Sequence, residues 1–533
     1  MSPVGRFELI LLLLAVVIGL ELLARRLRLP PAAALILGGI GLALIPGTPD
    51  MELDPDLVLV LFLPPLLLAS AYFTVWRDFR ANLRIILQLA VGAVAFTTLV
   101  VGVVAHLVEP ALPWAACFAL GAIVSPPDAV AAKAVLEHVR LPPRVTVLLE
   151  GESLVNDATG LVLFRFAVVA GLTGAFDAWQ AVFSFGTVAA GGVVVGIAFG
   201  VGASYLLTWL RDPLLSVLGS ALAAWGSYIG ADAIGVSGVL STVACGLVLG
   251  WRQHKILSAV TRLNARAVWD VVVFVLESLV FILIGLSLRG VLQRLGGSWA
   301  GLLPLLPAAA AIVAAVVLSR FAWIFPAVYV PRALIPSLRQ RDPFPPVAVP
   351  IVMSWAGMRG VVSLAAALSL PGAFPGRDFI LATTFAVILV TVLLQGTTLA
   401  PLIQMLRLGG FDLSPDGDRL SEAEARARMA AAQLAAVEQL GVAPDGTERH
   451  PRLIEQYRFR AQASLRFSDA KGALIEHRNE HFDVVLAALE AGRAEVLRLH
   501  KAGEIHDMVL SALELELDLE EVTALRHRAG GTS

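Results

Sequence analysis

Long apolar runs, separated by short polar or charged segments, recur along the chain up to about residue 408. A membrane-spanning helix needs about 20 predominantly apolar residues. The pattern therefore predicts an all-α polytopic membrane protein. Its thirteen candidate membrane helices are 7–24, 31–46, 56–75, 84–108, 113–134, 145–172, 178–209, 213–230, 235–251, 268–288, 301–330, 347–371 and 378–406.

Basic residues alternate between the predicted loops in a way that supports this count. Seventeen Lys and Arg residues fall on one predicted side of the membrane and only four on the other. Loops rich in Lys and Arg stay on the cytoplasmic side. We therefore expect a multi-pass protein of the cell membrane, with its N-terminus outside and its C-terminal region in the cytoplasm.

Composition agrees with a membrane location and excludes several other classes. The chain is 57% hydrophobic and 15% charged, whereas a soluble domain has about 25% charged residues. The net charge of -2 gives no indication of nucleic-acid binding. Cys117 and Cys245 lie in apolar runs and are predicted to be small core residues. We expect no cofactor.

A change of composition near residue 411 predicts a second domain. Residues 1–408 form the predicted transmembrane domain, and residues 411–533 combine helical spacing with many charges. We expect this segment to be a soluble, cytoplasmic helical tail with a regulatory role. Six histidines lie in it, and they are either a pH sensor or ordinary exposed helix residues. They are His450, His477, His481, His500, His506 and His527.

Two predicted membrane helices carry interruptions with charges attached. In "FALGAIVSPPDAVAAKAV", Pro126 and Pro127 remove backbone donors directly before Asp128. In "VPIVMSWAGMRGVVSLAAALSLP", two glycines flank Arg359. A break at membrane depth is tolerated only where it is buried in protein or lines a cavity. Both segments therefore point to functional positions.

The two interruptions occupy matching places if the membrane domain is an internal repeat. We predict two six-helix copies, at about 7–172 and 213–406, joined by a linking helix at 178–209. Corresponding helices of the two copies are seven spans apart. Because seven is an odd number, the second copy is inverted relative to the first. Interrupted helices at corresponding positions of an inverted repeat indicate the midplane site of a transporter. The alternative is that Gly and Pro are simply frequent in membrane helices.

In the linking helix, Gly192, Gly196 and Gly200 predict close helix packing.

The stretch "EGESLVNDATGLVLFRF", at 150–166, carries the candidate ion chemistry. An ionisable residue inside a membrane is a functional candidate by default. Ser153 and Asp157 are four residues apart and share one helix face. Because hard cations prefer oxygen ligands, we predict a monovalent cation site at Asp157, Asp128 and Ser153, completed by carbonyls freed near Pro127.

Glu152 and Asn156 share a different face of the same helix. A lone buried charge is costly, so Glu152 needs a positive partner. We predict that Arg359 is this partner, and that the pair ties the two interrupted segments together.

These motifs resemble those of the monovalent cation:proton antiporter-1 family, which comprises NhaP-type and animal-type Na+/H+ exchangers. The resemblance rests on "GESLVNDATGLVLF", "SPPDAVAA", "SWAGMRGVVSLAAALSLP" and "SGVLSTVACGLVLG", and covers most of residues 7–408. It implies an NhaA-like fold and a homodimer of thirteen-helix protomers, each with an interface domain and a moving core domain. It also implies electroneutral exchange of one cation for one proton. Carried over, Asp157 binds ion or proton, Asp128 and Ser153 assist, Asn156 orients the site, and Glu152 with Arg359 forms a supporting ion pair.

The chain departs from the family pattern at three positions. Many relatives have Thr where Pro127 stands, an acid where Ala69 stands, and Asn near Glu277. Glu277 either pairs with Arg320 or is a further proton site. Arg165 lies two helical turns beyond Asp157. We expect it to have a structural role and to neutralise a carboxylate in the core.

Four functions compete for this pattern. Exchange of Na+ for H+ is favoured, with Li+ as a further possible ion, and exchange of K+ for H+ by the same machinery is the alternative. An ion channel would need a continuous pore with repeated filter loops, which the sequence does not show. An intramembrane enzyme would use Asp128 and Asp157 as an acid dyad, but the repeat and the arginine motif fit transport better.

Overall fold

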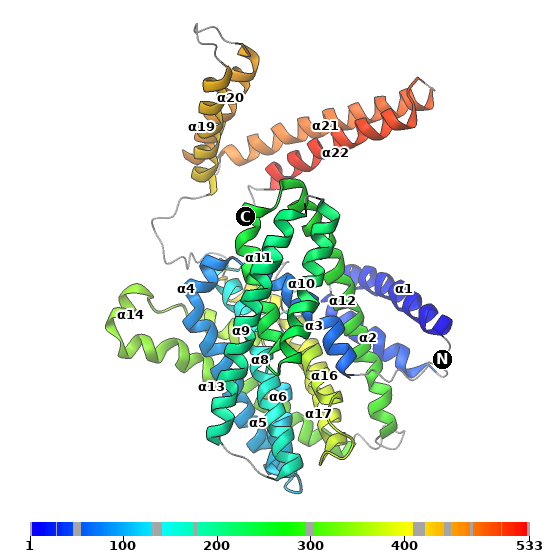
Figure 1. Ribbon diagram of the computed structural model, residues 1–533, viewed down its shortest axis with the longest axis vertical. Coiled ribbons are helices and arrows are strands. Elements are labelled where there is room, and N and C mark those ends of the chain that lie inside the picture. Colours follow the sequence, from blue (N-terminus) through cyan, green and yellow to red (C-terminus); the bar gives the residue numbers. More distant parts are fainter. Residues whose placement is uncertain are drawn as a thin grey trace. The chain divides into compact units, whose positions relative to one another are not determined.

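The computed structural model describes residues 3–27, 29–45, 55–128, 132, 141–174, 178–210, 212–294, 303–408, 422–441, 449–469, 473–502 and 504–529. Every regular element within these ranges is a helix (Figure 1), so the predicted all-α class is confirmed. Four of the seventeen basic residues that orient the predicted loops lie outside the described residues: Arg28, Lys133, Arg140 and Arg211. The chain divides into two compact units, Met1–Pro415 and Asp416–Ser533.

Within the described part of the first unit, seven helices are long and apolar enough to cross a membrane. They are α4 (Trp76–Leu87) continuing through η1 (Gln88–Ala93) into α5 (Val94–Val108), α8 (Pro143–Thr173), α9 (Ala178–Trp209), α10 (Pro213–Ala233), α12 (Ala259–Arg294), α13 (Leu306–Leu334), and α17 (Arg377–Val390) continuing through η4 (Thr391–Gln395) into α18 (Gly396–Met405).

Other helices make up the rest of the described part of the first unit. They are α1 (Pro3–Leu27), α2 (Pro31–Leu44), α3 (Pro55–Phe73), α6 (Trp114–Val124), α11 (Gly238–Ile256), η3 (Leu303–Leu305), α14 (Pro336–Arg341), α15 (Ala348–Trp355) and α16 (Val361–Leu368). The two spans predicted to be interrupted differ from the rest. One contains α6, which ends four residues before Asp128, and the other is divided into α15 and α16.

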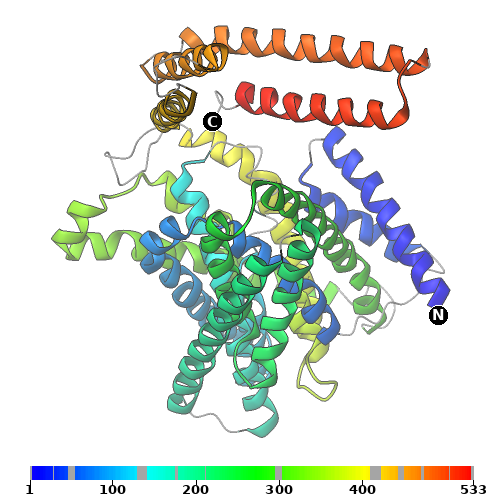
Figure 2. The same cartoon turned by 45° about the horizontal axis from the view of Figure 1, so that its top comes forward.

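Packing contacts group the helices of the first unit into two bundles (Figures 1 and 2). The scaffold bundle consists of α1 to α3 and α9 to α12. In it, α2 packs on α12, and α11 packs on α3 and α9. The site bundle consists of α4, η1, α5, α6, α8, α13, η4 and α15 to α18. In it, α6 packs between α5 and α8, and α13 packs on α5 and α15. The bundles meet where α3 contacts α16, α11 contacts α8, and α12 contacts α17.

Small residues allow the closest helix contacts of the scaffold bundle. A Cβ added to Gly285 of α12 would lie 2.7 Å from Gly39 Cα and 2.7 Å from Ile40 N on α2. Gly196 and Gly200 of α9 lie against α11 and Gly192 lies against Ser237, directly before α11; a Cβ on Gly200 would be 3.0 Å from the carbonyl oxygen of Cys245. The predicted close packing of that glycine series is confirmed, and it follows from backbone contacts that leave no room for a side chain.

The second unit consists of two helical hairpins. α19 (Glu422–Gly441) pairs with α20 (Pro451–Asp469), and α21 (Ala473–Lys501) pairs with α22 (Asp507–Ala529) (Figure 1). Arg493 of α21 forms ion pairs with Asp518 and Glu521 of α22, at 2.5 and 2.7 Å. The imidazole of His500 lies 2.6 Å from Asp507 where the two helices join.

The contact between α2 and α12 gives a prediction with a matched control on one helix. Gly285→Val should destabilise the protein by about 1–3 kcal/mol, because the added atoms would overpack against the backbone of α2. Gly290→Val should behave like the parent, since no atom lies within 4 Å of a Cβ added there. Thermal unfolding of the purified variants in one detergent measures both. Equal effects at the two positions would show that helix propensity, and not the interhelical contact, is responsible.

Candidate functional site

The first interruption exposes backbone carbonyls at the end of α6. Pro126 and Pro127 have no N–H groups, so the helix cannot continue its ladder through them. The hydroxyl of Ser125 donates to the carbonyl of Ala122, at 3.2 Å, and accepts from Thr98, at 3.1 Å. The last carbonyls of α6 therefore need donors from outside their own helix.

The second interruption, residues 356–360, separates α15 from α16 and requires glycine at its second residue. A Cβ added to Gly357 would lie 2.6 Å from Nε of Arg320 and 2.9 Å from Nη1 of Arg359. Any side chain there would collide with two guanidinium groups. Glycine is thus the residue that lets two arginines approach the same short stretch of backbone.

Arg359 joins the two interruptions. Its Nε donates to the carbonyl of Val124, at 2.8 Å, and its Nη2 donates to that of Ser125, at 3.3 Å. Its Nη1 donates to the carbonyl of Gly357, and its backbone N–H donates to the hydroxyl of Thr391, at 3.2 Å. The guanidinium is fully buried. A cation at the C-terminus of α6 also complements the negative end of the helix dipole.

Glu152 has a different partner from the one predicted. Its two carboxylate oxygens accept from Nη1 and Nη2 of Arg320, at 2.6 and 3.1 Å. Arg320, on α13, also donates to the carbonyl of Met353 on α15, at 3.0 Å. The predicted pairing of Glu152 with Arg359 is therefore wrong, because the guanidinium of Arg359 is directed at backbone carbonyls of α6. The bidentate geometry is the strong form of a charge-assisted contact.

Asp128 connects the interruptions a second time. Its backbone N–H donates to the carbonyl of Met358, at 2.6 Å. Its carboxylate lies directly against Gly360, the residue before α16, where an added Cβ would overlap Oδ2. The N-terminus of a helix stabilises negative charge. The two breaks thus form a reciprocal arrangement, with a cation at the end of α6 and an anion at the start of α16.

Asn156 and Asp157 of α8 face the first interruption. The amide of Asn156 donates to the carbonyl of Pro127, at 2.7 Å, so that carbonyl is held in place by a side chain. Gly160, one turn later, lies so close to Pro126 that a Cβ would press on its ring. Both Asn156 and Asp157 are buried. The oxygen of the Asn156 amide is buried without a hydrogen-bond partner in the described structure.

The oxygen donors near the breaks suit a hard monovalent cation. The carboxylates of Asp157 and Asp128 interact electrostatically as like charges. Ser153 lies one helical turn before Asp157 on α8 and is partly buried. The described residues bring together no group of three or more His, Cys, Asp or Glu that would hold a metal ion. Two carboxylates with neutral amide and hydroxyl oxygens therefore form the candidate ligand set.

The other predicted residues lie outside this set. Arg165 forms an ion pair with Asp232, at 3.3 Å, and both side chains are exposed. The expectation that Arg165 neutralises a core carboxylate is therefore wrong. Glu277 is partly buried on α12, and Ala69 is buried on α3. Arg320, the guanidinium considered for Glu277, is bound by Glu152 on two of its nitrogens.

A polar cluster that the sequence did not indicate holds one end of the site bundle together. Asp342, which precedes α15, forms ion pairs with Arg144 at 2.8 Å and Arg332 at 2.5 Å. Arg144 also donates to the side chain of Asn82 on α4, at 3.1 Å. One carboxylate thus connects α8, α13 and, through Arg144, α4. No motif marks it, because its members are far apart in the sequence.

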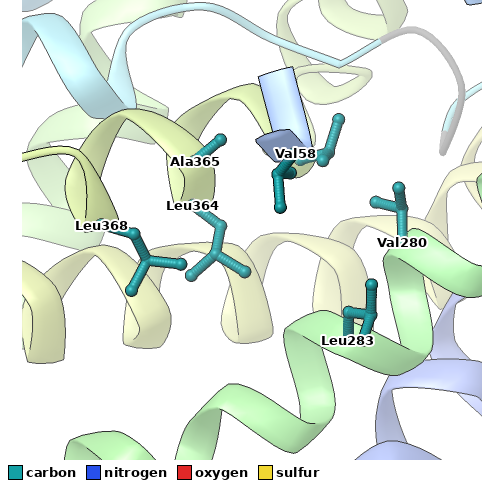
Figure 3. Close-up of a pocket in the computed structure, with 7 residues that line it drawn as sticks. Val58, Val280, Leu283, Leu364, Ala365 and Leu368 are labelled. Carbon is teal, nitrogen blue, oxygen red and sulfur yellow. The ribbon is translucent and has the colours of Figure 1, made fainter. Parts of the chain in front are cut away.

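The boundary between the two bundles contains an apolar pocket (Figure 3). Its lining comes from α3, α12 and α16, and every residue in it is aliphatic. These residues are Val58, Val280, Leu283, Val361, Leu364, Ala365 and Leu368. The pocket offers no polar side chain to an ion and is separate from the candidate ligand set.

Comparison with known proteins identifies the family. The family model described as sodium/hydrogen exchanger, transmembrane, matches residues 11–405. The chain belongs to the Na+/H+ exchanger family. An uncharacterized Na+/H+ exchanger of Mycobacterium tuberculosis is 34% identical, over 98% of this chain and 96% of the relative. The Na+/H+ antiporter NhaH of Halobacillus dabanensis is 31% identical, over 74% of this chain and 97% of the relative.

Two further comparisons bear on ions and fold. A sodium, potassium, lithium and rubidium/H+ antiporter of Bacillus pumilus is 33% identical, over 74% of this exchanger and 61% of the relative. The structure of the sodium proton antiporter MjNhaP1 from Methanocaldococcus jannaschii at pH 8 matches with a TM-score of 0.59 and 20% identity. It covers 77% of this exchanger and 100% of that chain. The exchanger therefore has the fold of NhaP-type antiporters, and its family consists of transporters rather than enzymes.

The buried ion pair of Glu152 and Arg320 gives a stability prediction. Glu152→Gln should lower stability by about 3–5 kcal/mol, because it leaves the guanidinium buried without its counter-charge. The double variant Glu152→Gln with Arg320→Gln should be more stable than Glu152→Gln alone, since no uncompensated charge remains. Thermal unfolding of both variants provides the test. A double variant less stable than either single variant would contradict the pairing.

The Asp342 cluster gives a pH-dependent prediction. Burial acts to raise the pKa of Asp342, but hydrogen bonds and positive charge from Arg144 and Arg332 outweigh it and hold the pKa below its ordinary value. A depressed pKa stabilises the fold above the ordinary Asp value of about 4, and this stabilisation is lost as the pH falls through the folded-state pKa. Asp342→Asn should therefore cost about 1–3 kcal/mol at neutral pH.

The difference between Asp342→Asn and the parent should shrink as the medium is acidified below about pH 4. Thermal unfolding at neutral and acidic pH measures it. Asp378→Asn, at an exposed site in the first turn of α17, is the matched control. A difference that stays constant with pH would show that Asp342 does not act through its charge.

Proposed function

We propose that this exchanger moves one monovalent cation, Na+ in the first place, in return for one proton. Asp157 binds either the cation or the proton. Asp128 and Ser153 assist it, and Asn156 holds the carbonyl of Pro127 in position. Glu152 with Arg320, and separately Arg359, maintain the surrounding structure without binding the ion.

The observation that carries this proposal is that two helix interruptions are joined to each other and to Asn156, the residue next to Asp157. The Asn156 amide fixes one interruption beside Asp157, and Arg359 ties that interruption to the other. Two nearby carboxylates, Asp128 and Asp157, cannot both remain charged and unpaired in a low-dielectric site. A proton or a cation relieves the repulsion, and the two compete for one carboxylate. Exchange of one positive charge for another is electroneutral.

The architecture suggests how the site is exposed to either side. We propose thirteen membrane helices in two inverted repeats, a homodimer, an outside N-terminus and a cytoplasmic regulatory tail. The site bundle carries Asp157 and moves against the scaffold bundle, giving alternating access of the elevator type. Aliphatic side chains, such as those of the pocket in Figure 3, line part of the boundary between the bundles. Among the described residues, the ion pair of Arg165 on α8 and Asp232 on α10 does join the two bundles, but both side chains are exposed, so breaking it during the movement costs little.

K+/H+ exchange is the second candidate. It is favoured by the relative from Bacillus pumilus, whose description includes potassium and rubidium with sodium and lithium. Pro127 also bears on the choice between Na+ and K+, because it lacks the side-chain hydroxyl that Thr offers at this position in many relatives.

Proton flux in proteoliposomes tests the proposal. Purified exchanger is reconstituted with a pH-sensitive dye inside, and Na+, K+ or Li+ is added in turn. A response to one cation should name the transported ion. Asp157→Asn should abolish the response, because an amide cannot alternate between proton and cation. The exposed Asp378→Asn should retain it. Full activity of Asp157→Asn, with the parent's cation dependence, would reject the proposed site.

A further inference from the structure

The last helix of the second unit is apolar on two opposite sides. At 100° per residue, Leu510, Leu513, Leu517 and Ala524 share the side of α22 that faces α21. Ala524 is buried there, and Leu517 lies 3.5 Å from a Cβ added to Gly492 of α21. This side accounts for the packing of the hairpin.

The opposite side carries a second series of apolar residues, which we call the outer stripe: Met508, Ala512, Leu515, Leu519 and Val522. All five are exposed, with exposed fractions of 75% for Met508, 61% for Leu515, 60% for Leu519 and 50% for Val522. The outer stripe repeats at intervals of four, three, four and three residues. This spacing is the heptad pattern of a coiled-coil seam.

Charges beside the outer stripe argue against a lipid surface as its partner. Glu516 and Asp518 flank it, Glu514 and Glu520 lie further round the helix, and one basic residue, Arg526, follows Val522 on the same side. Helices that lie on membranes carry Lys and Arg beside their apolar face, because the cytoplasmic leaflet is negatively charged. An acid-flanked stripe is repelled by such a leaflet. A regular heptad spacing is instead complementary to another helix.

The flanking residues are compatible with a second, parallel copy of α22. In the heptad set by the outer stripe, Ser511 and Asp518 occupy g positions, and Glu516 and Thr523 occupy e positions. A parallel pair brings each g residue next to the e residue of the following heptad in its partner. Ser511 then meets Glu516, and Asp518, which is already paired with Arg493 of its own chain, meets Thr523. Each of these two contacts joins a hydroxyl to a carboxylate, so like charges do not face each other at these positions.

We propose that the outer stripe of α22 pairs with the same stripe of a second copy of this chain, forming a short parallel coiled coil between the two tails. The proposal rests on the homodimer proposed above. A seam of about two heptads is weak by itself, since isolated helices of this length are marginal. Two membrane units that already associate hold the tails at high effective concentration, which makes a short seam sufficient.

Cysteine cross-linking of the full-length exchanger tests the contact. In a background with Cys117 and Cys245 replaced by Ala, Leu515→Cys places a thiol at the centre of the outer stripe. Glu520→Cys, exposed on the same helix but outside the stripe, is the matched control. With a short bismaleimide, Leu515→Cys should give at least about ten-fold more covalent dimer than Glu520→Cys.

Adding Leu519→Asp to Leu515→Cys should reduce that yield by about ten-fold, because it places a charge in the seam. Leu519 is exposed within one chain, so its substitution should leave the melting of the hairpin unchanged. Equal cross-linking at 515 and 520, or none at 515, would overturn the proposal. The yield does not depend on transport. Mass photometry of the same samples shows separately whether the membrane units are dimeric, so failure of the coiled coil is distinguishable from failure of the proposed homodimer or exchange.

Discussion

A backbone carbonyl freed inside a membrane must find a donor within the protein, and in this exchanger Arg359 supplies it. Because α6 ends at Val124, the carbonyls of Val124 and Ser125 have no helical donors, and one guanidinium from the other interrupted segment binds both. The two breaks therefore stabilise each other. Arg359 thereby joins the end of α6 to the segment between α15 and α16.

The remaining buried charges are distributed around that contact. Glu152 and Arg320 neutralise each other and join α8 to α13 and α15. Asp128 lies at the start of α16, where the helix terminus favours an anion. Asp157 interacts electrostatically with Asp128, and the described ion pairs of this bundle, those of Glu152 and Asp342, do not include it. A carboxylate in that position is suited to exchange one positively charged ligand for another.

Local sequence signals predicted the parts of the site but not all of its pairings. Pro126, Pro127 and the glycines around Arg359 cause their breaks directly, so both breaks were predictable. The partner of Glu152 was not, because Arg320 and Arg359 both lie in apolar runs and only the packing of α13 decides between them. Asp342 lies in a loop that resembles any other charged loop. Its role depends on Arg144 and Arg332, which only the fold brings near.

The central claim is that proton and cation compete for Asp157. The most direct measurement is the number of protons released per cation bound by purified exchanger in a weakly buffered solution with a pH-sensitive dye. The account predicts about one proton released per Na+ bound at a pH where the site is protonated, and no release from Asp157→Asn. Saturable Na+ binding by the parent without proton release would contradict it.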